Sequence, residues 1–531
     1  MDRIVSSLKL EREPVPEDLV YKSGLDRIRE AVISSHFMDE LVKDANLELY
    51  DEGQFSARSL EIDSELVDKN LIPIILSASN VFWRSRAALV LDRAKANYRK
   101  YGLRDPGEIG IAQSITEVMF DRQYLRGSKE SCSRQLLCNR VKERIDTGSP
   151  IEMVIPALPY KISSPLKNRG RLPDLAEVSF ILRLYEIAAT IELIYREARP
   201  DLPGRLAGFT VISDGSRFNH LVDEPDNIIE NYRAHLGLWV ERLGLQRYVS
   251  LLDYRSLLRD RLPAVTLEAK SEIRNNARAQ YADAMDPIFN PYEMAATIRA
   301  VAEIEPDPEY SNGEGRFVSL LKSLIFTINY KALKRFEGLP ARQYRALYRD
   351  LTGHIFEPYA ILSPAELQSI QEEMNHSAEF PPEQKLKECL RQLMLREAWN
   401  AAIDYVAEIK SDRDLDQDPI LTCLPDHFRW TIHAKAGQLA ILMPTALGIS
   451  VQAWAGSAVF KLTKHNKIKL CTLPVLALEG AGAIPVRVRG MEDSLALTNQ
   501  PLFYIYPDVE FTDLDEFLSK IRTLFVRYRT S

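Results

Sequence analysis

The sequence lacks the features that mark several common classes of protein. It has 5 cysteines among 531 residues, and they are scattered: Cys132, Cys138, Cys389, Cys423 and Cys471. An odd number of dispersed cysteines suits a reducing compartment better than a disulfide framework. Cys132 and Cys138 are close together, but nothing completes the spacing of a zinc site. The sequence therefore predicts a cytoplasmic protein that holds no metal.

An excess of positive charge is also lacking. The formal net charge is −7, from 68 Lys and Arg against 75 Asp and Glu. Because basic residues are not in excess, nucleic acid is not expected as a partner. The first residues, MDRIVSSLKLEREPVPED, carry acids early and have no long apolar run, so a secretory signal is not expected.

Long apolar runs are scarce. The uncharged stretch 436–460 is long enough to span a bilayer, but it contains Pro444, Gly448 and Gly456. These proline and glycine residues favour two or three buried strands joined by turns, and no membrane association is expected.

The common enzyme motifs are missing too. GxGxxG, the P-loop, HExxH and GxSxG do not occur. The GAG at 480–482 has neither the spacing nor the following helix of a dinucleotide site.

The chain is long for one domain, and its 46% hydrophobic and 27% charged residues are typical of a globular protein. We predict three regions: a helical N-terminal extension over 1–110, a Rossmann-like α/β core over 111–305, and a region over 306–531. In the last region a helical segment, with a helix over 382–409, precedes a strand-rich part that completes the site. The acidic stretch 303–314 is expected to be a loop or linker.

The core contains the unit strand, helix, strand. Short apolar runs at 151–155 and 209–213 flank a helical pattern over 174–196, which predicts two parallel strands and their crossover. A helix carrying Tyr232 and a strand over 248–252 continue the alternation. The predicted fold class is therefore α/β, with a mostly parallel sheet and flanking helices.

Other elements follow from local patterns. A helix over 64–101 is expected to kink near Pro73, and a helical run ending at Gly148 precedes the first strand. The alternation at 428–432 predicts a half-buried strand that exposes Thr431. Thr512 is expected to cap a last helix.

Charged residues follow the predicted strands. Lys161 comes after the first strand, Asp214 after the second and Asp253 after the third. Ligands of open α/β sheets bind outside the carboxyl ends of the strands, so these side chains define a candidate site. Lys161 can bind an anion or form an imine, or it is a surface lysine. Asp214 can serve acid–base chemistry or simply begin a turn, and Asp253 is the weaker candidate.

A basic run follows Lys161. Lys167, Arg169 and Arg171 lie close together and suit recognition of a phosphate, although a solvated loop is the favoured interpretation. They make an anionic small molecule the expected ligand class. The arginines at 84, 86, 93 and 99 are interpreted as a solvated face rather than a phosphate site.

Histidines offer a further acid–base group. His433 lies late in the strand that begins at Phe428, beside Lys435, and is the best candidate, although a lone histidine is more often structural. His220 and His235 have less clear roles.

Five blocks together resemble a known family. They are PALPYKIS from Pro156, PDLAE from Pro173, SDGSRF from Ser213, REAW from Arg396 and RWTIHAK from Arg429. Their order and spacing are similar to those of the isocyanide (isonitrile) synthase family, also called the pyoverdine/dityrosine biosynthesis family. The resemblance covers about residues 110–490.

The resemblance implies a reaction. Such enzymes convert the α-amino group of an amino acid to an isocyanide, take the carbon from ribulose 5-phosphate, and need no metal or organic cofactor. Lys161, Asp214 and His433 are then the expected catalytic residues. The expected substrate-binding residues are Lys167, Arg169, Arg171, Arg217, Asp253 and Lys435. A downstream oxygenase is the expected protein partner.

The chain also departs from the family pattern. The segment after Lys161, ISSPLKNRGRLPD, is longer or shifted. Near Trp454 the chain has AWAG, with Ala455 where the family has His. Two alternatives therefore stay open: an enzyme that forms an N-formyl amino acid, and a non-catalytic member that binds a ligand or acts as a scaffold.

Overall fold

The computed structural model describes residues 60–100, 108–126, 133–161, 168, 170–222, 224, 226–290, 293, 296–297, 299–301, 317–318, 320–321, 324, 383–432, 438–442, 452–462, 468–489 and 500–527. These residues fall into two compact units. The larger unit takes its described residues from Asp51–Asn219, Glu224–Ala277 and Ala407–Ser531, and the smaller from His220–Asp223 and Arg278–Val406. The division at about residues 110 and 305 stays a prediction.

A parallel sheet forms the centre of the larger unit. Its strand order is β4-β3-β2-β5-β6, and every neighbouring pair is parallel. The strands are β2 (Ile151–Pro156), β3 (Ala207–Ser213), β4 (Val249–Asp253), β5 (Phe428–Thr431) and β6 (Leu439–Ala440). The predicted α/β class with a mostly parallel sheet is confirmed, because strands buried on both faces read as continuous apolar runs.

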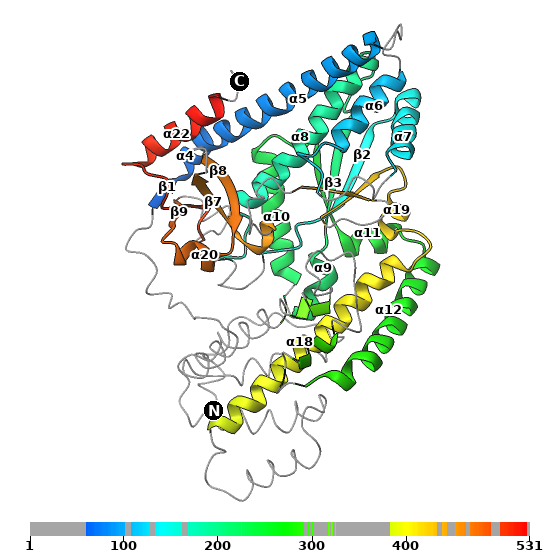
Figure 1. Cartoon of the computed structure of the whole chain (residues 1–531), viewed down its shortest axis with the longest axis vertical. Coiled ribbons are helices and arrows are strands. Elements are labelled where there is room, and N and C mark those ends of the chain that lie inside the picture. Colours follow the sequence, from blue (N-terminus) through cyan, green and yellow to red (C-terminus); the bar gives the residue numbers. More distant parts are fainter. Residues whose placement is uncertain are drawn as a thin grey trace, which may run out of the picture. The chain divides into compact units, whose positions relative to one another are not determined.

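Helices connect the strands in the expected way (Figure 1). The crossover from β2 to β3 is α8 (Leu175–Ala198), and α10 (Asp226–Arg242) joins β3 to β4. Before β2, α7 (Arg134–Thr147) ends at Gly148, whose φ of 67° is the left-handed conformation that glycine adopts at low cost. The predicted helices over 174–196 and up to Gly148 are therefore confirmed.

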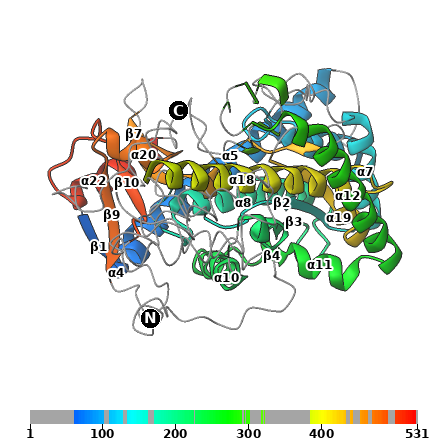
Figure 2. The same cartoon turned by 90° about the horizontal axis from the view of Figure 1, so that it is seen from below.

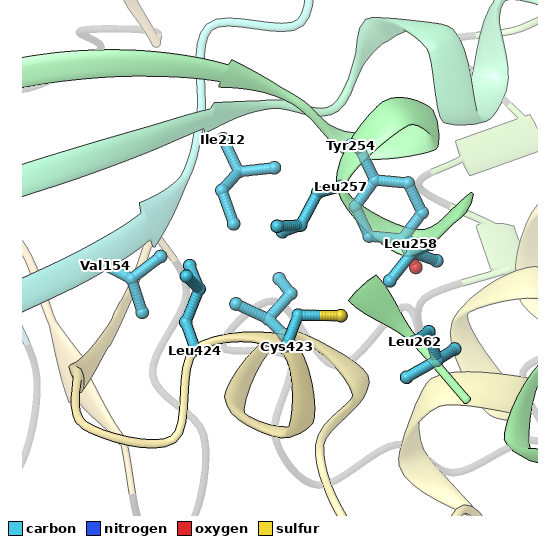
Figure 3. Packing of buried hydrophobic residues seen from close by; sticks show 9 residues of the cluster. Val154, Ile212, Tyr254, Leu257, Leu258, Leu262, Cys423 and Leu424 are labelled. Atoms are coloured by element: carbon cyan, nitrogen blue, oxygen red, sulfur yellow. The ribbon is translucent and has the colours of Figure 1, made fainter. Parts of the chain in front are cut away.

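One face of the sheet packs on two short helices. Val154 of β2 and Ile212 of β3 point towards α11 (Tyr254–Arg261) and α19 (Pro419–Cys423), as Figure 3 shows. The buried cluster is completed by Tyr254, Leu257, Leu258, Leu262, Ile420, Cys423 and Leu424. This apolar layer fixes the strands whose carboxyl ends carry the candidate site.

A second sheet mixes parallel and antiparallel strands. Its order is β1-β9-β10-β7-β8. The strands are β1 (Leu60–Asp63), β7 (Ser457–Leu462), β8 (Ile468–Leu473), β9 (Ile484–Arg489) and β10 (Phe503–Ile505). The expected strand-rich C-terminal part is confirmed, with α20 (Val475–Gly480) between β8 and β9. A short turn, η5 (Ala453–Ala455), leads into β7 and packs against α8.

Several expected helices are seen with adjusted ends. The helix over 64–101 divides into α4 (Ser64–Leu66), a π-helical turn (Val67–Leu71) and α5 (Ile72–Lys100), so the break falls next to Pro73. The smaller unit contains most of α18 (Glu383–Arg413), a single long helix in Figure 2. The linker at 303–314 lies outside the described residues.

Two local predictions are wrong. Thr431 is 5% exposed, so both faces of β5 are buried at this position of the sheet. The last helix, α22 (Leu514–Arg527), is capped by Asp513, whose carboxylate accepts a hydrogen bond from Glu516 N at 2.8 Å. Thr512 instead donates to the Glu516 carboxylate. In the part of the chain that the structure describes, no helix is both long and apolar enough to cross a bilayer.

Candidate active site

The candidate site lies where the strand order of the parallel sheet reverses. From β2 the chain proceeds to β3 and β4 on one side, and it returns to β5 on the other side of β2. In open parallel sheets, ligands bind outside the carboxyl ends of the strands at this position. Lys161 is in the loop that follows β2, as the sequence predicts.

The loop that carries Lys161 is fixed to the end of β3. Leu158 has a φ of 56°, an uncommon conformation for a residue with a side chain. Its carbonyl oxygen accepts a hydrogen bond of 2.9 Å from Ser213 Oγ. Gly215 approaches so closely that a Cβ atom there would lie 2.1 Å from the carbonyl oxygen of Pro159. Glycine is therefore required in the SDG turn.

Lys161 is completely buried, with 0% exposure. Its Nζ donates to Oε1 and Oε2 of Glu177, both at 2.8 Å, and to the carbonyl oxygen of Ala453 at 3.0 Å. Asp174 Oδ2 lies 3.1 Å from the same nitrogen. The reading of Lys161 as a surface lysine is wrong. Because two carboxylates already hold the ammonium group, it does not act as an open phosphate anchor in this structure.

Both carboxylates come from the first turn of α8. Asp174 is the N-cap, and its Oδ1 accepts from Ala176 N at 2.7 Å. Glu177 closes the capping box by accepting from Asp174 N at 2.9 Å. The PDLAE block is thus a helix start, and the helix dipole favours negative charge at this end. The same two side chains that cap the helix also bind Lys161.

A tyrosine from α10 completes the group. Tyr232 is completely buried and donates its hydroxyl hydrogen to Glu177 Oε1 at 3.1 Å. Burial, followed by the charge of Glu177, raises the pKa of Tyr232 well above its ordinary value, so its hydroxyl stays a neutral donor. We call Lys161, Asp174, Glu177 and Tyr232 the Lys161 cluster.

The charges of the Lys161 cluster do not balance, because one ammonium group faces two carboxylates. Burial raises the pKa of Glu177 to about 8, Lys161 opposes this shift, and Asp174 reinforces it. A carboxyl group with such a pKa exchanges its proton near neutral pH. The arrangement can therefore give a proton to a reacting group, or take one from it, inside a dry site.

The short turn η5 (Ala453–Ala455), which precedes β7, adjoins the Lys161 cluster. Ala453 accepts the hydrogen bond from Lys161, and the carbonyl oxygen of Trp454 accepts from Asn168 Nδ2 at 3.2 Å. The Trp454 ring meets the ring of Phe180 edge-on at 6.5 Å. Ala455 therefore belongs to a turn beside Lys161, and where the family pattern has His it brings no titratable side chain.

Asp214 and Arg217 follow β3 in sequence. Asp214 precedes α9 (Gly215–Phe218), and its charge helps to raise the pKa values of Tyr232 and Arg217. Burial opposes the charged form of Arg217, but nearby acids outweigh burial and raise its pKa. Arg217 Nε lies 3.1 Å from Glu408 Oε1, and its Nη1 lies 2.8 Å from Asp412 Oδ2. The charge of Arg217 is thus directed at α18.

The remaining described candidates also have partners in the fold. Asp253 is the N-cap of α11, accepting from Ser256 N at 2.8 Å, and it lies 3.1 Å from Arg233. Arg171 is half exposed and pairs with the buried Glu224 at 3.2 Å. Catalytic or binding roles for Asp214, Arg217, Asp253 and Arg171 stay predictions.

Some candidates cannot be placed. Lys167, Arg169, His433 and Lys435 lie outside the described residues. Of the other histidines, His220 is exposed, and His235 Nδ1 lies 2.7 Å from the Asn231 carbonyl oxygen within α10. Among the residues that the structure describes, no three His, Cys, Asp or Glu side chains gather in a way that could hold a metal ion.

Sequence reasoning missed three members of the Lys161 cluster as site residues: Asp174, Glu177 and Tyr232. For the first two a signal is present, since Asp and Glu three positions apart before an apolar helical run predict a capping box. Tyr232 carries no comparable signal, because only the packing of α10 brings it to Glu177.

Comparison with known proteins finds a family model and several relatives that this α/β protein resembles. Residues 141–311 match the family model described as pyoverdine/dityrosine biosynthesis protein. That range contains β2, α8, β3, α10 and β4, and with them every residue of the Lys161 cluster. The resemblance inferred from the sequence blocks is confirmed.

Three curated relatives are similar to this chain in sequence. The L-tyrosine isonitrile synthase of Xenorhabdus nematophila is 23% identical over 313 residues, which cover 53% of this chain and 85% of that protein. The L-tyrosine isonitrile synthase of Pseudomonas aeruginosa is 36% identical over 141 residues, or 25% of this chain and 40% of the relative. The L-tryptophan isonitrile synthase AmbI1 of Fischerella ambigua is 27% identical over 150 residues, or 27% of this chain and 42% of the relative.

These names support the enzyme class that the sequence blocks indicated. Among solved structures, the crystal structure of PvcA from Pseudomonas aeruginosa covers 75% of this chain and 100% of its own, with 18% identity and a TM-score of 0.42.

Proposed function

We propose that this protein is an isocyanide synthase that converts the α-amino group of an amino acid to an isocyanide in secondary metabolism. The observation that carries the proposal is the Lys161 cluster. It lies at the switch point of the parallel sheet, within the residues that match the family model. Three relatives named as tyrosine or tryptophan isonitrile synthases support an aromatic amino acid as substrate.

The carbon donor in this proposal is ribulose 5-phosphate. Its ketone carbon is attacked by the substrate amine, the C–N bond forms, and water leaves. The amine must lose protons and the departing oxygen must gain them, which requires a group that titrates near neutral pH. The raised pKa of Glu177 suits that task. Asp214 and His433 are the further proposed acid–base residues.

The phosphate and carboxylate of the substrates need cations. Since Lys161 is held by Glu177 and Asp174, we assign the phosphate to Arg171 with Lys167 and Arg169. Lys435 or Arg217 is proposed to bind the amino acid carboxylate, with Asp253 at the edge of the site. The proposal needs no metal or organic cofactor, and it places the enzyme in the cytoplasm with an oxygenase acting on its product.

The test uses purified protein, ribulose 5-phosphate labelled with ¹³C at the ketone carbon, and a panel of amino acids that includes tyrosine and tryptophan. Mass spectrometry should show an isocyanide that contains the label. A labelled formamide would instead make the protein an N-formyl-forming enzyme. Absence of any labelled product with every amino acid would overturn the proposal.

A variant pair ties the activity to the Lys161 cluster. Lys161→Met should abolish turnover. Lys270→Met is the matched control, because Lys270 is also a buried lysine between carboxylates, 2.6 Å from Glu408 and 3.1 Å from Asp412, outside the cluster. Equal activity in both variants would remove Lys161 from the site.

A second candidate function is binding without catalysis. Ala455 favours it, because a turn next to Lys161 lacks the histidine of the family pattern. In that case, calorimetry should detect binding of ribulose 5-phosphate or of an amino acid while the labelling experiment yields no product.

A further inference from the structure

The structure places one side chain in the candidate site that neither the sequence blocks nor the proposed reaction uses. Tyr232 reaches Glu177 from α10, the helix that follows β3, whereas the loop after β2 and the start of α8 supply the other three members of the cluster. It is among the largest completely buried side chains of the described chain. A buried tyrosine hydroxyl needs a partner, and here that partner is the carboxyl group that faces Lys161.

We infer that Tyr232 is a positioning residue, whose hydroxyl holds the Glu177 carboxyl group against Lys161 in the orientation that proton transfer requires. The inference rests on the proposed function for its catalytic part. Its structural part concerns Tyr232 and Glu177 alone and can be tested without substrate.

The geometry leaves Glu177 little freedom. Oε1 accepts from Tyr232 and Lys161, and Oε2 accepts from Lys161 and the Asp174 backbone. The two oxygens are therefore held from three elements: the loop after β2, the start of α8, and α10. Removing the Tyr232 hydroxyl leaves Lys161 as the remaining donor to Oε1, so the carboxyl group loses its restraint from α10.

The charged groups around this carboxyl group come from each neighbouring element. Lys161 and Asp174 face it directly, and Asp214 acts on Tyr232 from the end of β3. Of these, Lys161 favours the ionised form of Glu177 and Asp174 disfavours it. The hydroxyl of Tyr232 stays protonated and donates to the carboxylate, which makes the hydrogen bond stronger when Glu177 is ionised.

Tyr232→Phe tests the inference through unfolding by urea at pH 5 and pH 9. The hydroxyl bonds a neutral acid at pH 5 and a carboxylate at pH 9. The factor by which the substitution raises the unfolding equilibrium constant should therefore be about five to tenfold greater at pH 9. In a Glu177→Gln background, this dependence on pH should vanish. An equal loss at both pH values, or the same dependence in the Gln background, would overturn the inference.

Tyr195→Phe is the matched control. Tyr195 is equally buried, but its hydroxyl donates to the carbonyl oxygens of Arg144 at 2.7 Å and Ser149 at 2.9 Å. These acceptors do not titrate, so the loss of stability in this variant should be the same at both pH values.

The catalytic readout is separate. If wild-type protein forms an isocyanide, Tyr232→Phe should lower kcat at least tenfold, leave KM within about twofold, and move the basic limb of the pH profile upward. Tyr195→Phe should change neither. An unchanged kcat and pH profile would show that Tyr232 is not a positioning residue. If wild-type protein forms no product, the proposed function fails, and the unfolding comparison still decides the contact between Tyr232 and Glu177.

Discussion

Ser213 Oγ donates a 2.9 Å hydrogen bond to the carbonyl oxygen of Leu158, and it thereby joins the carboxyl ends of β3 and β2. Leu158 has a positive φ, and the loop it begins carries Lys161. The orientation of the candidate catalytic lysine therefore depends on a hydroxyl in the neighbouring strand. This relationship gives the first prediction.

Ser213→Ala should leave the fold intact and lower its stability by about 1–3 kcal/mol, because a buried carbonyl oxygen loses its partner. Turnover should fall as well, since Leu158 is then less firmly held. Urea denaturation and the isotope-labelled product assay measure the two effects. Ser271→Ala is the control: that exposed hydroxyl bonds the Leu267 carbonyl oxygen on α12 (Ala264–Met285) at 2.9 Å, so little change is expected.

Gly215→Ala should disrupt the packing of the SDG turn against the loop that carries Lys161. The added Cβ would lie 2.1 Å from the Pro159 carbonyl oxygen, so the backbone of one of the two loops must move. We expect a stability loss of about 1–3 kcal/mol and a loss of turnover of at least a hundredfold. Gly237→Ala in α10 meets nothing within 4 Å and should be stabilising by up to about 1 kcal/mol. Equal behaviour of the two variants would contradict the close approach.

The pKa of Glu177 predicts how stability depends on pH. In the folded protein this pKa is raised from 4.5 to about 8. Below pH 4.5 both folded and unfolded states hold the proton, so the stabilising effect is fully present, and it is lost as pH rises to 8. Relative to Glu177→Gln, wild-type stability should fall by up to about 1.4 kcal/mol per pH unit in this window. Urea midpoints at pH 5, 6.5 and 8 provide the measurement, and parallel curves would refute the shift.

We expect Arg217 to contribute mainly to the stability of the fold. Its guanidinium lies between Glu408 and Asp412, which also pair with Lys270. Arg217→Gln should cost about 3–5 kcal/mol, because the buried Glu408 and the partly buried Asp412 lose a partner. If the variant folds and binds an amino acid as tightly as wild type, measured by calorimetry, the proposed carboxylate contact is wrong.

The packing under the sheet gives a plain test of the fold. Leu257 lies between β3 and α19 in the cluster of Figure 3 and is 4% exposed. Leu257→Ala should lower stability by about 2–5 kcal/mol. Leu238→Ala, at a position that is 41% exposed, should change it by less than about 1 kcal/mol.

The strands and helices around the site could be predicted from the sequence because each depends on a local pattern. Apolar runs marked β2, β3 and β4, and the crossover helix showed its apolar face. The same reasoning placed Lys161 and Asp214 at strand ends correctly. It failed at Thr431, which is 5% exposed although its place in the alternation of apolar and polar residues predicts an exposed side chain.

The partners of Lys161 were harder to predict. Glu177 is near in sequence, but its side chain turns to Lys161 only because the helix begins at Asp174. Tyr232 and Ala453 reach the cluster through tertiary packing. A lysine at a strand end reads as an anion site from sequence, and only the fold reveals that two carboxylates occupy its ammonium group.

The place of β5 in the parallel sheet has a consequence for how the protein is made. Strand β5 pairs with β2, and the hydrogen bond from Lys161 to Ala453 joins residues 292 positions apart. Such distant pairings form slowly, because the entropy of closing a long loop is lost before the contacts that stabilise it have formed. During synthesis, β2, β3 and β4 leave the ribosome long before their missing neighbour. The β2 edge then stays open until the C-terminal part arrives, so that interval is when the nascent chain is most exposed to aggregation.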